Sequence, residues 1–194
     1  RIPAPMLRAI AQIKEAAALA NASLGLLDDS NAEAIRKAAD EVASGDWDDH
    51  FPIDVFQTGS GTSWNMNVNE VISNVANVAL GPGLGTRSPI HPNDHVNLGQ
   101  SSNDVIPTAI SIATRVEAER TAVSLEALAT ELFATASEFD TVVKLGRTHL
   151  QDAVPMTLGD EFSAFAEQIK KGAERIRRCF PALEELPLGG QAIG

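Results

Sequence analysis

The 194 residues are enough for one or two domains, and an apolar content of 44% is enough to bury a substantial core. Fifteen Lys and Arg against 26 Asp and Glu give a net charge of −11, which argues against a partner such as nucleic acid or an acidic membrane surface. No apolar run reaches the roughly 18 residues of a membrane-spanning helix. Because the single cysteine, Cys179, cannot form an intrachain disulfide, we expect a reducing compartment, the cytoplasm.

The first 80 residues carry the patterns of three helices. Apolar residues at spacings of three and four predict helices over 3–27, 30–45 and 66–80. Ser30 followed by Glu33 is a capping-box pattern for the start of the second helix, and Gly45 ends that helix. The stretch over 46–63 is polar, rich in glycine and without a period, so we expect a loop there.

Two longer helices are expected in the second half of the chain, over 104–139 and 158–186. The first contains no glycine, and Pro107 fits only in its first turn, which puts the helix start near Asn103. The second has a regular apolar stripe that Pro181 breaks or kinks.

The long helices also set the expected fold class. A helix of 35 residues is roughly 50 Å long, and two of them cannot bury all their apolar faces against each other. The β-favouring run over 141–145 between them is too short to found a sheet. We therefore expect an all-α fold, with the two long helices antiparallel in a bundle that other parts of the protein or other subunits complete.

Two polar segments have the composition of anion sites. The segment 58–62 can fold into a tight loop whose N–H and O–H groups converge on an anion, or it can be an ordinary turn. Ser101, Ser102 and Asn103 lie at the start of a long helix, where free N–H groups and the helix dipole favour a carboxylate. The same residues are common helix caps, so a structural role stays open.

A third polar segment, 146–152, holds His149 between the two long helices. His149 lies off the apolar stripes, so it is a candidate for proton transfer, although a structural histidine is the commoner case. His91, Asp94 and His95 could join it around a metal, although the chain has no CxxC-like pair. We expect no metal and no organic cofactor.

Three sequence blocks, in this order and spacing, resemble the fumarase/aspartase superfamily over almost the whole chain. They are TGSGT at 58–62 with NMNVNEVI at 65–72, HPNDHVN at 91–97 with QSSND at 100–104, and GRTHLQDAVPMTLGDEF at 146–162. FPIDVFQTGSGT at 51–62 and the second serine of QSSND resemble the fumarases more than the aspartases. The resemblance implies an all-α homotetrameric lyase with active sites shared between subunits. It further implies reversible hydration of fumarate to L-malate in the tricarboxylic acid cycle, through an aci-carboxylate intermediate.

The resemblance also implies roles for individual residues. His149 is implied as the acid/base and Thr148 as a substrate contact. Further substrate contacts are implied for Ser60, Gly61, Thr62, Ser101, Ser102 and Asn103. A second dicarboxylate site near the entrance of the active site is implied for His91, Pro92, Asn93 and Asp94.

By the same resemblance, the chain is an N-terminal fragment of the family fold. Residues 1–98 would form an N-terminal helical domain and 99–194 the first part of the central helical-bundle domain, with the family's catalytic serine loop beyond Gly194. Three residues depart from the family pattern: Trp64, Ser88 with the basic Arg87 one position off, and Gln191. Two alternatives stay open, an aspartate ammonia-lyase of the same superfamily and a non-catalytic structural relative.

Overall fold

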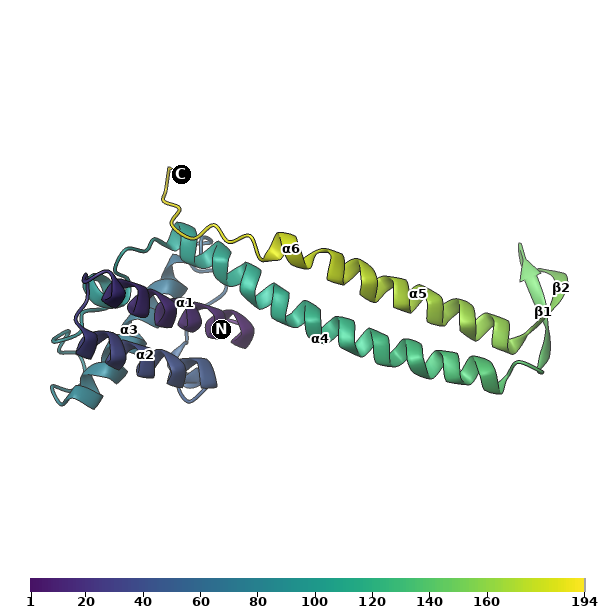
Figure 1. Ribbon diagram of the computed structural model, residues 1–194, viewed down its shortest axis with the longest axis horizontal. Coiled ribbons are helices and arrows are strands. Elements are labelled where there is room, and N and C mark those ends of the chain that lie inside the picture. The colour runs from purple at the N-terminus through teal and green to yellow at the C-terminus, as the bar shows by residue number, and fades with distance from the viewer. Residues whose placement is uncertain (194) are drawn as a thin grey trace. The chain divides into compact units, whose positions relative to one another are not determined.

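The computed structural model describes residues 1–193 and divides into two compact units (Figure 1). Unit 1 comprises Arg1–Thr114 and the chain from Glu184 on, and unit 2 comprises Arg115–Leu183. Both are mostly helical, as the predicted fold class requires. None of the helices within residues 1–193 combines the length and the apolar character needed to cross a membrane. The expected domain boundary after residue 98 stays a prediction, because the two units describe contacts within the chain and not independently folding domains.

Unit 1 is built on three helices, α1 (Ala4–Ser23), α2 (Asp29–Ser44) and α3 (Thr62–Leu80). α1 packs along α2, and α2 packs against α3. The core between them consists of aliphatic side chains with almost no exposure: Leu7, Ile10, Ile35, Val42, Val68 and Ile72. The apolar stripes that predicted these helices are thus the faces that become buried.

The predicted cap of α2 is wrong. Asp28, not Ser30, caps this helix, and its carboxylate accepts a hydrogen bond from the N–H of Asn31 (2.9 Å). The Ser30 hydroxyl donates to the same carboxylate (2.7 Å), and Glu33 binds the guanidinium of Arg36 instead of closing a capping box. Aspartate is as good a cap as serine, so the helix begins at Asp29 instead of after Ser30.

The expected loop over 46–63 is partly helical. A single 3-10 turn, η1 (Asp48–His50), lies within it, and α3 begins at Thr62, before the predicted residue 66. The first turn of α3 is polar, so its residues gave no apolar period from which the start could be predicted. Gly81, in the left-handed conformation, ends α3 where the glycine-rich stretch predicted an end.

α4 (Ser102–Glu138) is the longer of the two long helices, and it begins close to the predicted Asn103. The chain reaches it through η2 (Pro92–Val96), a single π-helical turn. Pro107 lies beyond the first turn of α4, contrary to the prediction. Since proline has no N–H, the carbonyl of Asn103 receives no hydrogen bond from position 107.

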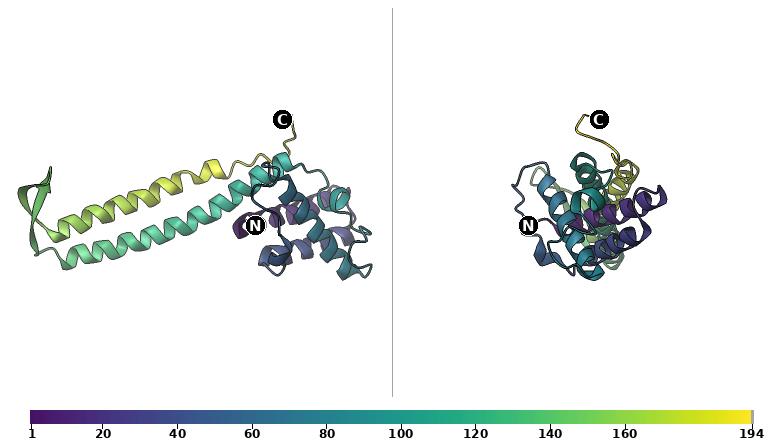
Figure 2. Two further views of the ribbon diagram at one scale, coloured as in Figure 1. Left: turned by 180° about the vertical axis from the view of Figure 1, so that it is seen from behind. Right: turned by 90° about the vertical axis from the view of Figure 1, so that its left-hand side faces the viewer.

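Unit 2 contains the second part of α4, a β-hairpin, α5 (Leu158–Arg178) and the short α6 (Phe180–Leu183). α4 and α5 run side by side and antiparallel, as predicted (Figures 1 and 2). The rings of Phe139 and Phe162 lie 5.9 Å apart at one end of this pair, and Arg177 binds Glu126 (2.8 Å) further along it. The predicted helix over 158–186 is interrupted just before Pro181, which confirms the expected break.

The β-hairpin of unit 2 corrects a further expectation. The run over 141–145 continues as strand β1 (Val143–Thr148), which pairs antiparallel with β2 (Gln151–Thr157). Within residues 1–193 these are the only strands. A run too short for an extended sheet can still form a hairpin when a tight turn brings the chain straight back. The polar segment around His149 was expected between the two long helices, but the strands on either side of it were not.

Candidate active site

The start of α4 is a capped helix N-terminus. The Ser101 hydroxyl accepts a hydrogen bond from the N–H of Asn103 (3.2 Å) and donates one to the Asn103 amide oxygen (3.0 Å). The Asp104 carboxylate accepts the N–H of Ser101 (2.8 Å), so the side chains of Ser101 and Asp104 both accept backbone N–H groups at the helix start. Ser101 therefore has a structural role, while the half-buried Ser102 and the exposed Asn103 stand at the positive end of the helix dipole.

The segment 58–62 packs against this helix start. Gly61 precedes α3 with φ 75°, and a Cβ atom there would lie 2.9 Å from the side chain of Ile106 in α4. Only glycine combines this backbone conformation with so close an approach. The hydroxyl oxygens of Ser60 and Thr62, on either side of it, lie 3.0 Å apart. Small hydroxyl residues and a helix N-terminus thus meet in one place, as an anion site requires.

A largely buried polar cluster, which no sequence motif predicted, lies next to the start of α4. We call it the Lys14 cluster: Lys14, Asn65, Asn69, Asn97 and Gln100. The Lys14 ammonium donates to the side-chain oxygens of Asn97 (2.9 Å) and Gln100 (2.8 Å). The Asn97 oxygen also accepts from the amides of Asn65 (3.3 Å) and Asn69 (3.2 Å). The Asn65 amide reaches further, to the hydroxyl oxygen of Ser102 (3.0 Å), so the cluster is linked directly to α4.

Burial lowers the pKa of Lys14 from 10.5 to about 7, while the nearby Asp104 acts in the opposite direction. Between these two values the unfolded chain binds more protons than the folded chain, so the stability of the fold rises with pH across this window. From pH 7 to pH 9, the free energy of unfolding of the wild type should rise by about 2 kcal/mol relative to that of Lys14→Met, at about 1.4 kcal/mol per pK unit. Urea denaturation of both proteins at the two pH values measures this difference. A difference that does not change with pH would contradict the lowered pKa.

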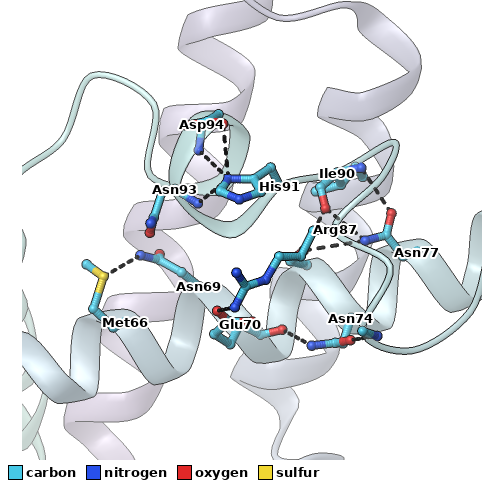
Figure 3. Close-up of polar contacts among 12 residues, drawn as sticks. Met66, Asn69, Glu70, Asn74, Asn77, Arg87, Ile90, His91, Asn93 and Asp94 are labelled. Carbon is cyan, nitrogen blue, oxygen red and sulfur yellow. Dashed lines mark hydrogen bonds and ion pairs between the residues drawn. The ribbon is translucent and has the colours of Figure 1, made fainter.

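The residues of the expected second dicarboxylate site lie in and next to η2 (Figure 3). The His91 ring accepts hydrogen bonds from the N–H groups of Asn93 (3.3 Å) and Asp94 (3.2 Å), so it caps this turn. Arg87, the basic residue nearest in sequence, binds the carboxylate of Glu70 (3.0 Å). The structure gives His91 a local structural role and gives Arg87 an internal counter-ion, and the second site stays a prediction.

Thr148 and His149 belong to unit 2, at the tip of the hairpin. His149 and Leu150 form its two-residue turn, with φ angles of 50° and 61°. Residues other than glycine rarely take this conformation at two successive positions, and asparagine-glycine is the usual pair in such turns. Strain of this kind is found most often at functional sites. The exposed His149 side chain is thus presented on a defined turn, as a proton-transfer group must be.

Within residues 1–193, no three side chains of His, Cys, Asp or Glu come together in a group that could hold a metal ion. His91 and Asp94 are adjacent, but their contact is part of the capped turn. His149 lies in the other unit. The chemistry that these residues can perform is anion binding at α4 and proton transfer at His149.

The chain is similar in sequence and in fold to known lyases. Residues 2–194 match the sequence model of a lyase family. The chain is 58% identical, over 96% of its length, to the class II fumarate hydratase of Halobacterium salinarum, and 52% identical over its whole length to the mitochondrial fumarate hydratase of Rattus norvegicus. The crystal structure of class II fumarase from Schistosoma mansoni matches 99% of the chain with a TM-score of 0.95 at 44% identity.

The chain therefore belongs to this lyase family, which confirms the resemblance to the fumarase/aspartase superfamily. Fumarate hydratases are among its relatives at 50–58% identity, as the fumarase-like motifs predicted. The chain spans 40%, 38% and 40% of the lengths of the three proteins compared above.

Proposed function

We propose that this chain is part of a class II fumarate hydratase that adds water reversibly to fumarate to give L-malate. The observation that supports this most is that the segment Ser60–Thr62 packs against the start of α4. The chain that forms this contact is 58% identical to a fumarate hydratase. Since the chain spans about 40% of that relative, the activity belongs to a longer protein that contains it, which we call the full-length enzyme.

The chemistry follows from the charges that develop during the reaction. Dehydration of malate removes a proton from a carbon next to a carboxylate, which leaves a doubly charged aci-carboxylate. The N–H groups at the start of α4 and the Asn103 amide can donate to that carboxylate and stabilise it. Such local donors are needed because the net charge of −11 repels a dianion at long range.

His149 supplies the second half of this mechanism. In dehydration the imidazolium gives its proton to the leaving hydroxyl, and in hydration the neutral imidazole takes a proton from the attacking water, with Thr148 as a substrate contact. The base that takes the carbon-bound proton is expected beyond Gly194. The residues of this chain therefore bind one carboxylate and serve the oxygen side of the reaction, without a cofactor.

A turnover assay on the full-length enzyme tests the proposal and its alternatives. Hydration is followed by the loss of fumarate absorbance, and the enzyme should convert fumarate to malate. Release of ammonia from aspartate would identify an aspartate ammonia-lyase instead. Turnover of neither substrate would support the non-catalytic alternative.

We further propose that the full-length enzyme is a homotetramer with active sites shared between subunits. Unit 2 leaves large apolar side chains exposed on α4 and α5: Val116, Val123, Leu128, Phe133 and Phe165. Exposed apolar residues along a helix pair are typical of a bundle that other chains complete. Sedimentation equilibrium should give four times the subunit mass, and a stable monomer at micromolar concentration would contradict the proposal. A cytoplasmic location is likewise proposed.

A further inference from the structure

Lys14 occupies a position where an apolar side chain would be the ordinary choice. Its neighbours one turn away on α1, Ile10 and Ala18, belong to the buried core. Within residues 1–193, Lys14 is the only lysine or arginine that is fully buried. An amine removed from water costs free energy that methionine of similar length would not cost, so packing alone does not account for a lysine here.

The partners of Lys14 all belong to segments that lead to α4. Gln100 directly precedes Ser101, and Asn97 lies in the same connection between η2 and α4. The Lys14 ammonium therefore fixes two points of the chain just before the helix start.

A second path runs through Asn65 to Ser102. The Asn65 amide points its NH2 group at the oxygens of Asn97 and Ser102, while its own oxygen has no hydrogen-bond partner within residues 1–193. An amide that leaves its oxygen unpaired is oriented by the acceptors of its NH2 group. Lys14 holds one of those acceptors, the Asn97 oxygen, in place.

Charge is the third element of the arrangement. Asp104 is 1% exposed, and its carboxylate is committed to the N–H groups of Ser101 (2.8 Å) and Gly189 (2.9 Å). A buried carboxylate next to a site for a dianion would repel it. Lys14 interacts electrostatically with Asp104, which favours the protonated form of the buried amine, while burial acts in the opposite direction.

We infer that Lys14 is a positioning residue, which acts through Asn97 and Asn65 to hold the carboxylate-binding start of α4 in place. This inference rests on the proposed function, because the start of α4 binds a carboxylate only under that proposal. Lys14 itself is buried beneath the site and does not touch the substrate.

Steady-state kinetics of Lys14→Met in the full-length enzyme test this inference. Loosening the helix start weakens ground-state binding, so KM for fumarate should rise about tenfold, the effect of weakening one hydrogen bond to a charged group. kcat should change less. The Kd of succinate, a saturated dicarboxylate that does not react, should rise by a similar factor in calorimetric titration. A purely structural lysine would instead reduce the fraction of active enzyme and lower kcat without changing KM.

Two further variants make the test specific. Arg8→Met is the control for the loss of one positive charge, because Arg8 is exposed on the same helix. Its KM should stay at the wild-type value. Asn65→Leu removes the hydrogen bond from Asn65 to Ser102 but keeps the buried amine of Lys14. This variant replaces Lys14→Met in the test if Lys14→Met does not fold. Asn65→Leu should raise KM as Lys14→Met does, and the double variant should be little worse than either single one, because both changes interrupt one path.

The outcomes separate the inference from the proposed function. If the wild type does not hydrate fumarate, the proposed function fails and the inference fails with it. If the wild type is active and both Lys14→Met and Asn65→Leu keep the wild-type KM and succinate affinity, the inference alone is overturned.

Discussion

Replacing His149 by Asn in the full-length enzyme is expected to lower kcat by about 10²-fold or more, the usual scale of general acid–base catalysis. The hairpin should survive this change. His149 has φ 50°, and asparagine takes the left-handed conformation more readily than almost any other residue except glycine. The imidazole is exposed at the tip of the turn, so its removal leaves no cavity in unit 2. Fumarate absorbance gives kcat, and circular dichroism gives the fold.

Leu150→Asn is the matched control, because Leu150 is the other central residue of the same turn, with φ 61°, and is 98% exposed. This variant also places asparagine at a position of the turn with positive φ, but it removes no imidazole. Its kcat should therefore stay within a small factor of the wild-type value. Equal losses in both variants would assign the effect to the turn. A folded His149→Asn tetramer with near wild-type turnover would show that His149 is structural.

Asn103→Ala should behave differently from His149→Asn. It removes a donor to the aci-carboxylate and leaves proton transfer intact, so we expect kcat/KM to fall by about tenfold, the value of one charge-assisted hydrogen bond. Asn103 is exposed and its amide oxygen bonds only within the cap, to Ser101, so the helix should still form.

The sequence predicted the helices better than their ends, for a physical reason. An apolar stripe at spacings of three and four is repeated over many residues, and it becomes the buried face, as for Ile10 and Ile35. A helix start depends on a competition among a few polar groups. Asp28 and Ser30 both fit the start of α2, and only their geometry decides between them.

The candidate site shows the same division. The residues at the start of α4 could be identified from one segment, because a helix N-terminus is a local feature. The approach of Gly61 to Ile106 could not, because it depends on how α3 packs on α4. One signal for the buried cluster was present but unused: Asn65, Asn69, Ser73 and Asn77 follow each other at intervals of four along α3, and all are buried. A polar stripe at helical spacing indicates a buried hydrogen-bonding face as much as a solvated one.

Among the glycines of unit 2, Gly159 is the one where an added Cβ atom would come closest to another chain segment, and Gly159→Ala is expected to destabilise the fold by about 3 kcal/mol. A Cβ atom at this position would lie 2.5 Å from the carbonyl oxygen of Ala136 and 2.9 Å from the Cα of Asp140. Both are backbone atoms at the end of α4, so no side chain can rotate away. The start of α5 would have to move, which would break the hydrogen bond from the Gly159 N–H to the carbonyl of Phe139 (3.1 Å).

Gly172→Ala is the matched control for this prediction, since it places the same methyl group on the same helix. At Gly172 a Cβ atom would meet only the flexible end of Arg175, at 3.8 Å. Alanine in the interior of α5 should therefore stabilise the protein by up to about 1 kcal/mol, because glycine is the poorer helix former. Urea denaturation followed by circular dichroism should shift the midpoint down for Gly159→Ala and up for Gly172→Ala. Shifts of the same sign would mean that helix propensity, and not the close approach to α4, determines the effect at Gly159.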